Sequence, residues 1–169
     1  MTTSVRGADP ADAAAIAEVH VRSWQIAYRG IVPDDVLDGL SVAQRERMWG
    51  DLLAHGAGGP LVLVAERDDH VIGFCSALTQ ARDGAGDAEI TAIYVEPGHW
   101  REGVGAALLS AALQELRCAG QTAVTLWMFA ANDRALAFYR RFGFLADGAQ
   151  AVDAASGQAE VRLRATLPG

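Results

Sequence analysis

Lysine is absent from this 169-residue chain, so its 14 basic residues are all arginines, and they face 21 acidic residues for a net charge of −7. Nucleic acid is therefore disfavoured as a partner, because binding to phosphate backbones depends on clustered lysines and arginines. An anionic ligand needs local help here, from backbone N–H groups or from a few arginines. The acidic balance mildly favours a cationic acceptor.

Cysteines and long apolar runs are also scarce. Cys75 and Cys118 are the only cysteines, and neither has the spacing of a metal site or a redox pair. The four histidines lack paired metal-binding spacing, and the G-x-S-x-G motif of serine hydrolases does not occur. No run of eighteen apolar residues is free of charge, and residues 1–10 hold no apolar run behind a basic region. We expect a cytoplasmic protein with no metal and no membrane partner.

The rest of the composition is that of an ordinary globular protein, with 51% apolar and 21% charged residues. The length fits a single domain, residues 1–169, with a core large enough to need no disulfide. Start signals for helices stand at Asp9-Pro10 and at Ser41.

Two kinds of periodicity divide the chain. Helices are expected at residues 11–28, 34–40, 41–54, 103–119 and 132–142. Strands are expected at residues 4–7, 61–67, 70–79, 88–95, 122–129, 144–152 and 158–167. This order predicts an α+β fold with an embedded strand–helix–strand–helix unit, in which helices cover one mixed sheet.

The most informative stretch is a strand that leads through a loop into a helix beginning with Gly103-Val104-Gly105. Unpaired N–H groups at a helix start and the helix dipole attract anions, and glycines let a phosphate approach the backbone. A pyrophosphate fits such a site. The alternative is that the two glycines only allow close packing at the start of the helix.

Two other nucleotide motifs do not match this stretch. A Rossmann fingerprint needs a third glycine where Leu108 stands, and an acidic residue at the end of the next strand, which ends in Met128-Phe129. A Walker A loop needs Lys and then Ser or Thr after its second glycine, but Gly103 is followed by Val104-Gly105. Dinucleotide and triphosphate chemistry are therefore disfavoured.

Three segments in the right order and at the right separation resemble the GCN5-related N-acetyltransferase (GNAT) superfamily. They are Ala88-Glu89-Ile90-Thr91-Ala92-Ile93-Tyr94-Val95, the Gly103-Val104-Gly105 loop, and the run from Asn132-Asp133-Arg134-Ala135 to Phe138-Tyr139-Arg140-Arg141-Phe142-Gly143-Phe144. The resemblance implies the GNAT fold: a central mixed, mostly antiparallel sheet of about six or seven strands, splayed in the middle and flanked by about four or five helices. It also implies an N-acetyltransferase that uses acetyl-CoA as co-substrate.

The resemblance assigns the coenzyme site. The pantetheine arm is expected between strand 88–95 and the next strand, and the pyrophosphate on the N–H groups of the glycine loop. Trp100 stands where the family usually has Arg or Gln, so Arg101 is expected to supply the charge. Asn132 has two open roles, as a helix cap and as a coenzyme contact. The implied coenzyme-binding set is Ile93, Tyr94, Val95, Arg101, Glu102, Gly103, Val104, Gly105, Ala106, Asn132, Ala135, Phe138 and Tyr139.

Two catalytic residues follow from the same resemblance. Tyr139 occupies the position of the acid that protonates the leaving thiolate, although a tyrosine beside Phe138 and Phe142 is also typical of a core. Glu89 occupies the position of the general base in histone-acetylating members. By the two-residue period Glu89 is expected to share one strand face with Thr91, Ile93 and Val95. The alternative is that Glu89 is merely a solvated strand residue.

The acceptor is expected to be a small-molecule primary amine that attacks the thioester directly. Trp24, Tyr28 and Trp127 are candidates for its pocket, because family substrates enter between the first helices and the sheet; core packing is the alternative for each. Homodimers are common in the family. Three other functions stay open: a non-catalytic acyl-CoA-binding module, a peptide or protein N-acetyltransferase, and a fold in which Trp100 closes the phosphate loop.

Overall fold

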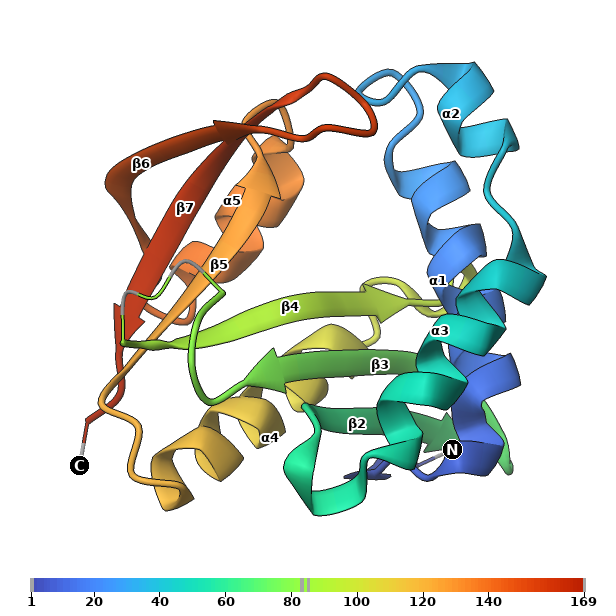
Figure 1. Ribbon diagram of the computed structural model, residues 1–169, viewed down its shortest axis with the longest axis horizontal. Helices are drawn as coiled ribbons and strands as arrows, with labels where there is room; N and C mark the ends of the chain where they lie inside the picture. The colour runs from blue at the N-terminus through green and yellow to red at the C-terminus, as the bar shows by residue number, and fades with distance from the viewer. Residues whose placement is uncertain (1, 83, 85, 169) are drawn as a thin grey trace.

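The computed structural model describes residues 2–82, 84 and 86–168, which form a seven-stranded sheet in the order β1-β2-β3-β4-β5-β7-β6 (Figure 1). All neighbouring strands are antiparallel except β4 and β5, which are parallel. The sheet confirms the expected mixed, mostly antiparallel fold. The strands are β1 (Ser4–Gly7), β2 (Leu61–Arg67), β3 (His70–Leu78), β4 (Ala88–Val95), β5 (Ala123–Phe129), β6 (Leu145–Val152) and β7 (Ala159–Thr166).

Five α-helices accompany the sheet in the described residues, at the places the sequence predicts. Local signals set their starts: the Ser41 hydroxyl accepts a hydrogen bond from the N–H of Gln44, and the Asn132 side chain accepts one from the N–H of Ala135. The helices are α1 (Ala13–Ala27), α2 (Asp34–Asp38), α3 (Val42–Ala54), α4 (Val104–Cys118) and α5 (Asp133–Arg140), and short 3₁₀ turns cover Pro10–Asp12, Gly56–Gly58 and Pro97–His99.

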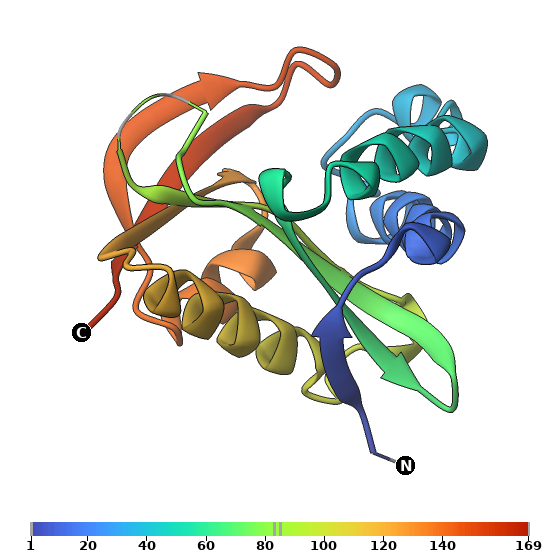
Figure 2. The same cartoon turned by 60° about the horizontal axis from the view of Figure 1, so that its bottom comes forward.

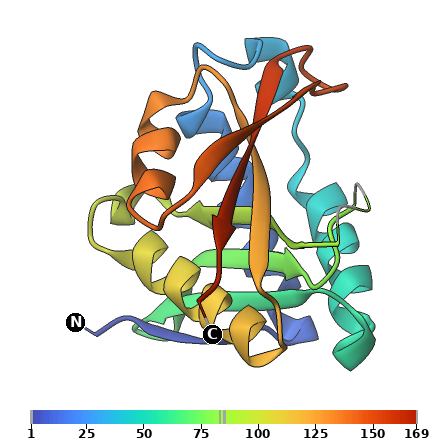
Figure 3. The ribbon, with the colours of Figure 1, turned by 90° about the vertical axis from the view of Figure 1, so that its left-hand side faces the viewer.

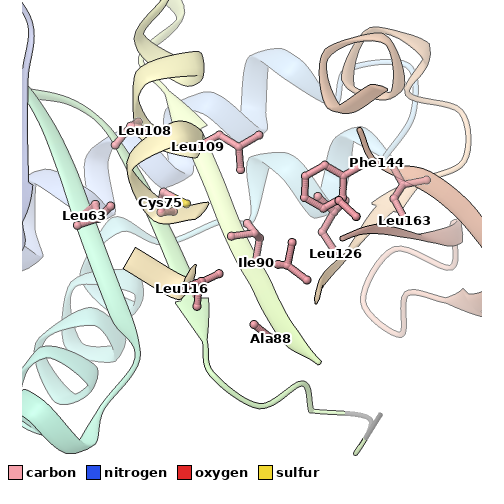
Figure 4. Close-up of a cluster of buried hydrophobic side chains, with 14 of the residues drawn as sticks. Leu63, Cys75, Ala88, Ile90, Leu108, Leu109, Leu116, Leu126, Phe144 and Leu163 are labelled. Carbon is pink, nitrogen blue, oxygen red and sulfur yellow. The ribbon is translucent and has the colours of Figure 1, made fainter. Parts of the chain in front are cut away.

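The helices form two layers, with α1, α2 and α3 on one face of the sheet and α4 and α5 on the other (Figure 2). The main core lies between α4 and the sheet. There Leu108, Leu109 and Leu116 of α4 pack over strand residues such as Cys75 and Ile90 (Figure 4). All of these side chains are buried, and their removal from water stabilises the fold.

The parallel strands β4 and β5 part halfway along their length. They pair only at Ala88–Val124, Glu89–Thr125 and Ile90–Leu126, although both strands continue well beyond these pairs. Figures 1 and 3 show them diverging from this point. The expected splay in the middle of the sheet is therefore present.

A β-bulge interrupts β4 just where the splay begins. Ala77 of β3 pairs with Ile90 and Ser76 pairs with Ala92, so Thr91 has no residue opposite it. One extra residue on one strand resets the alternation of side chains between the two faces.

The bulge corrects one expectation from the sequence. Ile90 lies in the core beneath α4, and Ile93 and Val95, beyond the bulge, pack against that same core. Glu89, directly before Ile90, therefore points to the other face, toward the layer of α1 and α3. The expectation that Glu89, Thr91, Ile93 and Val95 share one face was wrong, because a strict period of two does not survive an inserted residue.

The second core, on the α1 and α3 side, encloses a histidine. The indole N–H of Trp49 donates to Nδ1 of His20 over 3.1 Å, and the His20 ring stacks on Tyr94 with centroids 5.2 Å apart. Burial, with a smaller contribution from the charge of Arg45, lowers the pKa of His20 to about 3. The imidazole is therefore neutral in the folded protein at neutral pH.

His20 predicts a loss of stability in acid. Between pH 6.5 and about 3, His20 is protonated in the unfolded chain but stays neutral in the folded chain. As the pH falls through this range, His20 therefore lowers the free energy of unfolding by up to ~1.4 kcal/mol per pH unit. In His20→Gln the amide oxygen can still accept from Trp49, but this proton uptake is gone. Urea unfolding at pH 7 and pH 4.5 is expected to show about 2 kcal/mol less acid loss in the variant than in the wild type. Equal losses would contradict a neutral buried His20.

Candidate active site at the strand splay

The splay opens into a cavity of about 550 Å³. Its walls come from the end of β4, the start of α4, one side of α5 and the end of α1. A narrow hollow of about 40 Å³ continues it between β4 and β5. Elements far apart in the sequence thus meet at one place, and the residues that line both spaces are Tyr28, Ile93, Tyr94, Asn132, Ala135 and Tyr139.

The start of α4 forms one wall of the cavity. Gly103 precedes the helix with φ 84°, a left-handed conformation that favours glycine, and no side chain caps the helix. The N–H groups of Val104, Gly105 and Ala106 have no partner within the helix. A β-carbon added at Gly105 would lie 3.6 Å from the Phe138 ring. The absence of a side chain at Gly105 therefore leaves the backbone accessible from the cavity. The arrangement suits an anion.

Three arginines stand around the same cavity: Arg101, Arg134 and Arg141. None of them forms an ion pair with another residue in the described part of the chain. The residues that line this cavity include no Asp or Glu. In a chain of net charge −7, this wall is therefore locally positive.

Trp100 shapes the mouth of the cavity without closing it. Its indole N–H donates to the carbonyl of Val95 over 2.7 Å, and the Arg134 guanidinium lies 4.1 Å from the centre of its ring. Such a cation–π contact fixes a positive charge. Arg134 was not predicted from the sequence as a site residue. The signal that could have found it is the helical spacing of Arg134, Phe138 and Arg141, which puts all three on one side of α5.

Main-chain groups of β4 are available on the side of the splay. The N–H of Glu96 donates to Ile72 of β3 over 2.8 Å. Because main-chain groups alternate between the two edges of a strand, those of Val95 and Ile93 face the parting from β5. The Val95 carbonyl already accepts from Trp100 and, over 3.0 Å, from the Ser23 hydroxyl, which leaves its N–H as the free group.

Tyr139 projects from α5 into both spaces. Its ring packs at 5.8 Å from that of Phe144, and its hydroxyl makes no hydrogen bond to any residue that the structure describes. Burial raises the pKa of Tyr139 above its usual range, and the neighbouring Tyr94 and Cys75 add to the effect. The hydroxyl therefore holds its proton at neutral pH and can donate it.

Glu89 lies outside the lining of both spaces. Its side chain is 2% exposed, and its carboxylate accepts hydrogen bonds from the backbone N–H and from the guanidinium of Arg82. A group in this position can exchange a proton with the cavity only through an intervening water.

Of the residues assigned to the coenzyme by resemblance, all but Glu102 line the cavity. The Glu102 carboxylate is held instead by Arg67 and His99, and the hydrogen bond from Arg67, followed by that from His99, lowers the pKa of Glu102. Asn132 lines the cavity while its side-chain oxygen accepts from the N–H of Ala135 over 3.1 Å, which leaves its amide N–H₂ free.

The candidates for the acceptor pocket lie on the α1 side. Tyr28 lines both spaces, and Trp127 lines the narrow hollow. Trp24 lines neither: it packs edge-on against Tyr28 with ring centroids 4.9 Å apart. The Tyr28 and Tyr94 hydroxyls are 3.3 Å apart. The pocket thus combines aromatic faces with a pair of hydroxyls.

Metal ligands are not gathered into a site within residues 2–82, 84 and 86–168. No group of three or more His, Cys, Asp and Glu side chains there is arranged to hold a metal ion. None of the helices in that part of the chain has the length and apolarity to cross a membrane.

Known proteins resemble this chain in fold or in sequence. The PaiA N-acetyltransferase of Thermoplasma acidophilum, solved in complex with coenzyme A, superposes with a TM-score of 0.83 at 20% identity, over 98% of this chain and 99% of that one. The uncharacterized N-acetyltransferase YuaI of Bacillus subtilis is 32% identical over 142 residues, which are 82% of this chain and 78% of that protein. The L-amino acid N-acyltransferase MnaT of Escherichia coli is 29% identical over 144 residues, 84% of this chain and 79% of that protein.

A family model that matches most of the chain identifies its family. The family model "Acetyltransferase (GNAT) family" covers residues 18–144, which include the end of α1, the splay, the start of α4 and all of α5. The splay cavity lies wholly within this range. On these grounds the chain belongs to the GNAT family and is an N-acetyltransferase of that family.

Proposed function

We propose that this N-acetyltransferase binds acetyl-CoA in the splay cavity and transfers the acetyl group to a primary amine of a small molecule. The observation that carries the proposal is the uncapped start of α4, which faces a cavity with three arginines and no carboxylate. That combination fits a diphosphate. The bound coenzyme A in the Thermoplasma relative supports the same ligand.

The coenzyme is proposed to lie along the cavity with its pyrophosphate at the start of α4 and its thioester near Tyr139. Its pyrophosphate meets the N–H groups of Val104, Gly105 and Ala106, with Arg101 and Arg134 nearby. Its pantetheine arm follows the free main-chain groups of β4, which brings the thioester toward Tyr139. Trp100 leaves this path open, which argues against a loop closed to phosphate.

The reaction is proposed as a direct attack. The neutral amine forms a C–N bond with the thioester carbon, while a main-chain N–H of β4 polarises the carbonyl. The C–S bond breaks, and the Tyr139 hydroxyl donates its proton to the leaving thiolate. Glu89 is proposed as the base that takes the amine proton, through a water, since its carboxylate lies outside the lining.

The acceptor is proposed to reach the thioester from the α1 side, between Tyr28 and Trp127. The Trp24 ring packs edge-on against the Tyr28 ring and helps to hold it in place. The similarity to MnaT, by its name an L-amino acid N-acyltransferase, supports a small molecule as the acceptor. A screen of primary amines that follows thiol release identifies the acceptor class directly.

Coenzyme binding is tested by Gly105→Glu. The new carboxylate places bulk and negative charge where the diphosphate is proposed to bind, and the added β-carbon itself meets Phe138 only at ordinary contact distance. Isothermal titration with acetyl-CoA is expected to show affinity reduced by roughly 100-fold or more. Gly58→Glu is the control, because Gly58 is exposed, has open space where a β-carbon would stand and lies away from the cavity. Unaltered binding in Gly105→Glu, or no binding in the wild type, would contradict the site.

The acid role is tested by Tyr139→Phe, which keeps the ring and removes the proton. Turnover with an accepted amine is expected to fall by roughly 10²-fold, while the dissociation constant for acetyl-CoA stays nearly unchanged. Thiol release and titration calorimetry measure the two quantities. Wild-type turnover in the variant would remove Tyr139 from the mechanism, and a wild type that binds acetyl-CoA without any turnover would favour the non-catalytic module.

A homodimer is proposed through β6, the outer strand of the sheet beside β7. Leu145 and Val152 of this strand are 65% and 68% exposed, and a second copy paired with this open edge would cover them. Sedimentation velocity is expected to give twice the monomer mass for the wild type. Val152→Lys is expected to shift the protein toward the monomer; a monomeric wild type would end the proposal.

A further inference from the structure

One carboxylate near the acceptor side lacks a partner. Glu160 at the start of β7 is half-buried, yet its carboxylate makes no hydrogen bond or ion pair with any residue the structure describes. The next charged residues of β7 on the same face are paired: Arg162 with Asp147 and Arg164 with Asp87, each at 2.7 Å. Glu160 is thus a negative charge that the fold partly buries and that has no hydrogen-bonded or ion-paired partner among the described residues.

The strand register gives the direction of the Glu160 side chain. Glu160 is paired with Phe129 of β5, and residues opposite each other in an antiparallel pair project from the same face. The Phe129 ring packs edge-on against Tyr28 with centroids 4.9 Å apart and lies 6.0 Å from Trp24. Glu160 therefore lies on the face that carries the aromatic side chains of α1, where the β6–β7 connection comes next to the loop after α1 (Figures 1 and 3).

The charge of Glu160 affects the pKa values of two tyrosine hydroxyls, those of Tyr28 and Tyr94. Burial raises the pKa of Tyr28 well above its usual range and raises the pKa of Tyr94, and the Glu160 charge adds to both shifts. Burial also raises the pKa of Glu160; Asp153 adds to this shift and Arg82 opposes it. The carboxylate thus acts on the same two phenols that line the cavity.

These groups match the chemistry of an ammonium ion. An ammonium has N–H donors and no acceptor, and it is bound by carboxylate and hydroxyl oxygens. Aromatic faces attract the same charge. The arginines that line the cavity stand at the start of α4 and along α5. On the acceptor side the Arg162 guanidinium lies 5.8 Å from the centre of the Trp127 ring, but it is paired with Asp147.

We propose that the hydroxyls of Tyr28 and Tyr94 bind the ammonium group of the acceptor, and that Glu160, which lies outside the lining of both spaces, attracts this cation through an intervening water. The inference rests on the proposed function and narrows its substrate class to amines that arrive as cations. The negative charge of Glu160 sets this preference. The carboxylate attracts the cation from the side opposite the coenzyme phosphates, so the two substrates of opposite charge enter by separate routes.

The test compares Glu160→Gln with the wild type and with Glu115→Gln, an exposed residue of α4 whose substitution makes the same change in net charge. Thiol release from acetyl-CoA is measured with butylamine, 1,4-diaminobutane and lysine amide, and with aniline as an amine that is neutral at pH 7. Glu160→Gln is expected to raise the KM of the cationic amines by about 10- to 100-fold with little change in kcat. Glu160→Asp is expected to recover part of the affinity, and Glu115→Gln to match the wild type.

Direct binding separates this inference from the proposed function. Titration calorimetry with acetyl-CoA tests the coenzyme site, and titration of 1,4-diaminobutane into the protein saturated with coenzyme A tests the ammonium site without turnover. An unchanged KM in Glu160→Gln, a preference for aniline, or no binding of 1,4-diaminobutane beside a normal acetyl-CoA isotherm would each overturn the ammonium site alone. A wild type that binds no acetyl-CoA would instead overturn the proposed function.

Discussion

The parting of β4 from β5 after Ile90 and Leu126 is the constraint on which the site depends. Two parallel strands that stop pairing leave main-chain groups along their inner edges, and a buried main-chain group without a partner is costly. The bulge at Thr91 marks the same point on β4. The fold accepts this local cost because β3 on one side and β7 on the other keep both strands in the sheet.

Charge divides the site into two halves. The carboxylates of this acidic chain lie outside the lining of the cavity, and several form ion pairs with arginines, as Asp12 does with Arg6 and Glu89 with Arg82. The arginines of the cavity, which form no ion pair within the described residues, stand near the start of α4 and along α5, and the aromatic and hydroxyl groups stand on the α1 side. A transferase for an anionic donor and a cationic acceptor needs such a separation, because opposite charges in one pocket would neutralise each other.

Much of the fold was predictable from sequence, because its signals are local. Periodicity and caps such as Ser41 placed the strands and helices to within a few residues. The resemblance to the GNAT superfamily, and not the spacing itself, implied that Tyr139 lies near the glycine loop. The GNAT family and fold are confirmed by comparison with known proteins.

The errors and omissions arose where distant segments decide the outcome. The orientation of Glu89 depends on a bulge that a two-residue period cannot reveal, and the carboxylate of Glu102 is taken by Arg67, 35 positions away. Glu160 was not predicted as a site residue, since only the pairing of β5 with β7 shows which face it occupies. Trp100, which breaks the family pattern, has its own consequence: its ring contacts the Arg134 guanidinium and restricts this long side chain at the mouth of the cavity before any ligand arrives. Part of the rotamer entropy of that arginine is thus lost during folding rather than on binding, which preorganises a counter-ion for an arriving diphosphate.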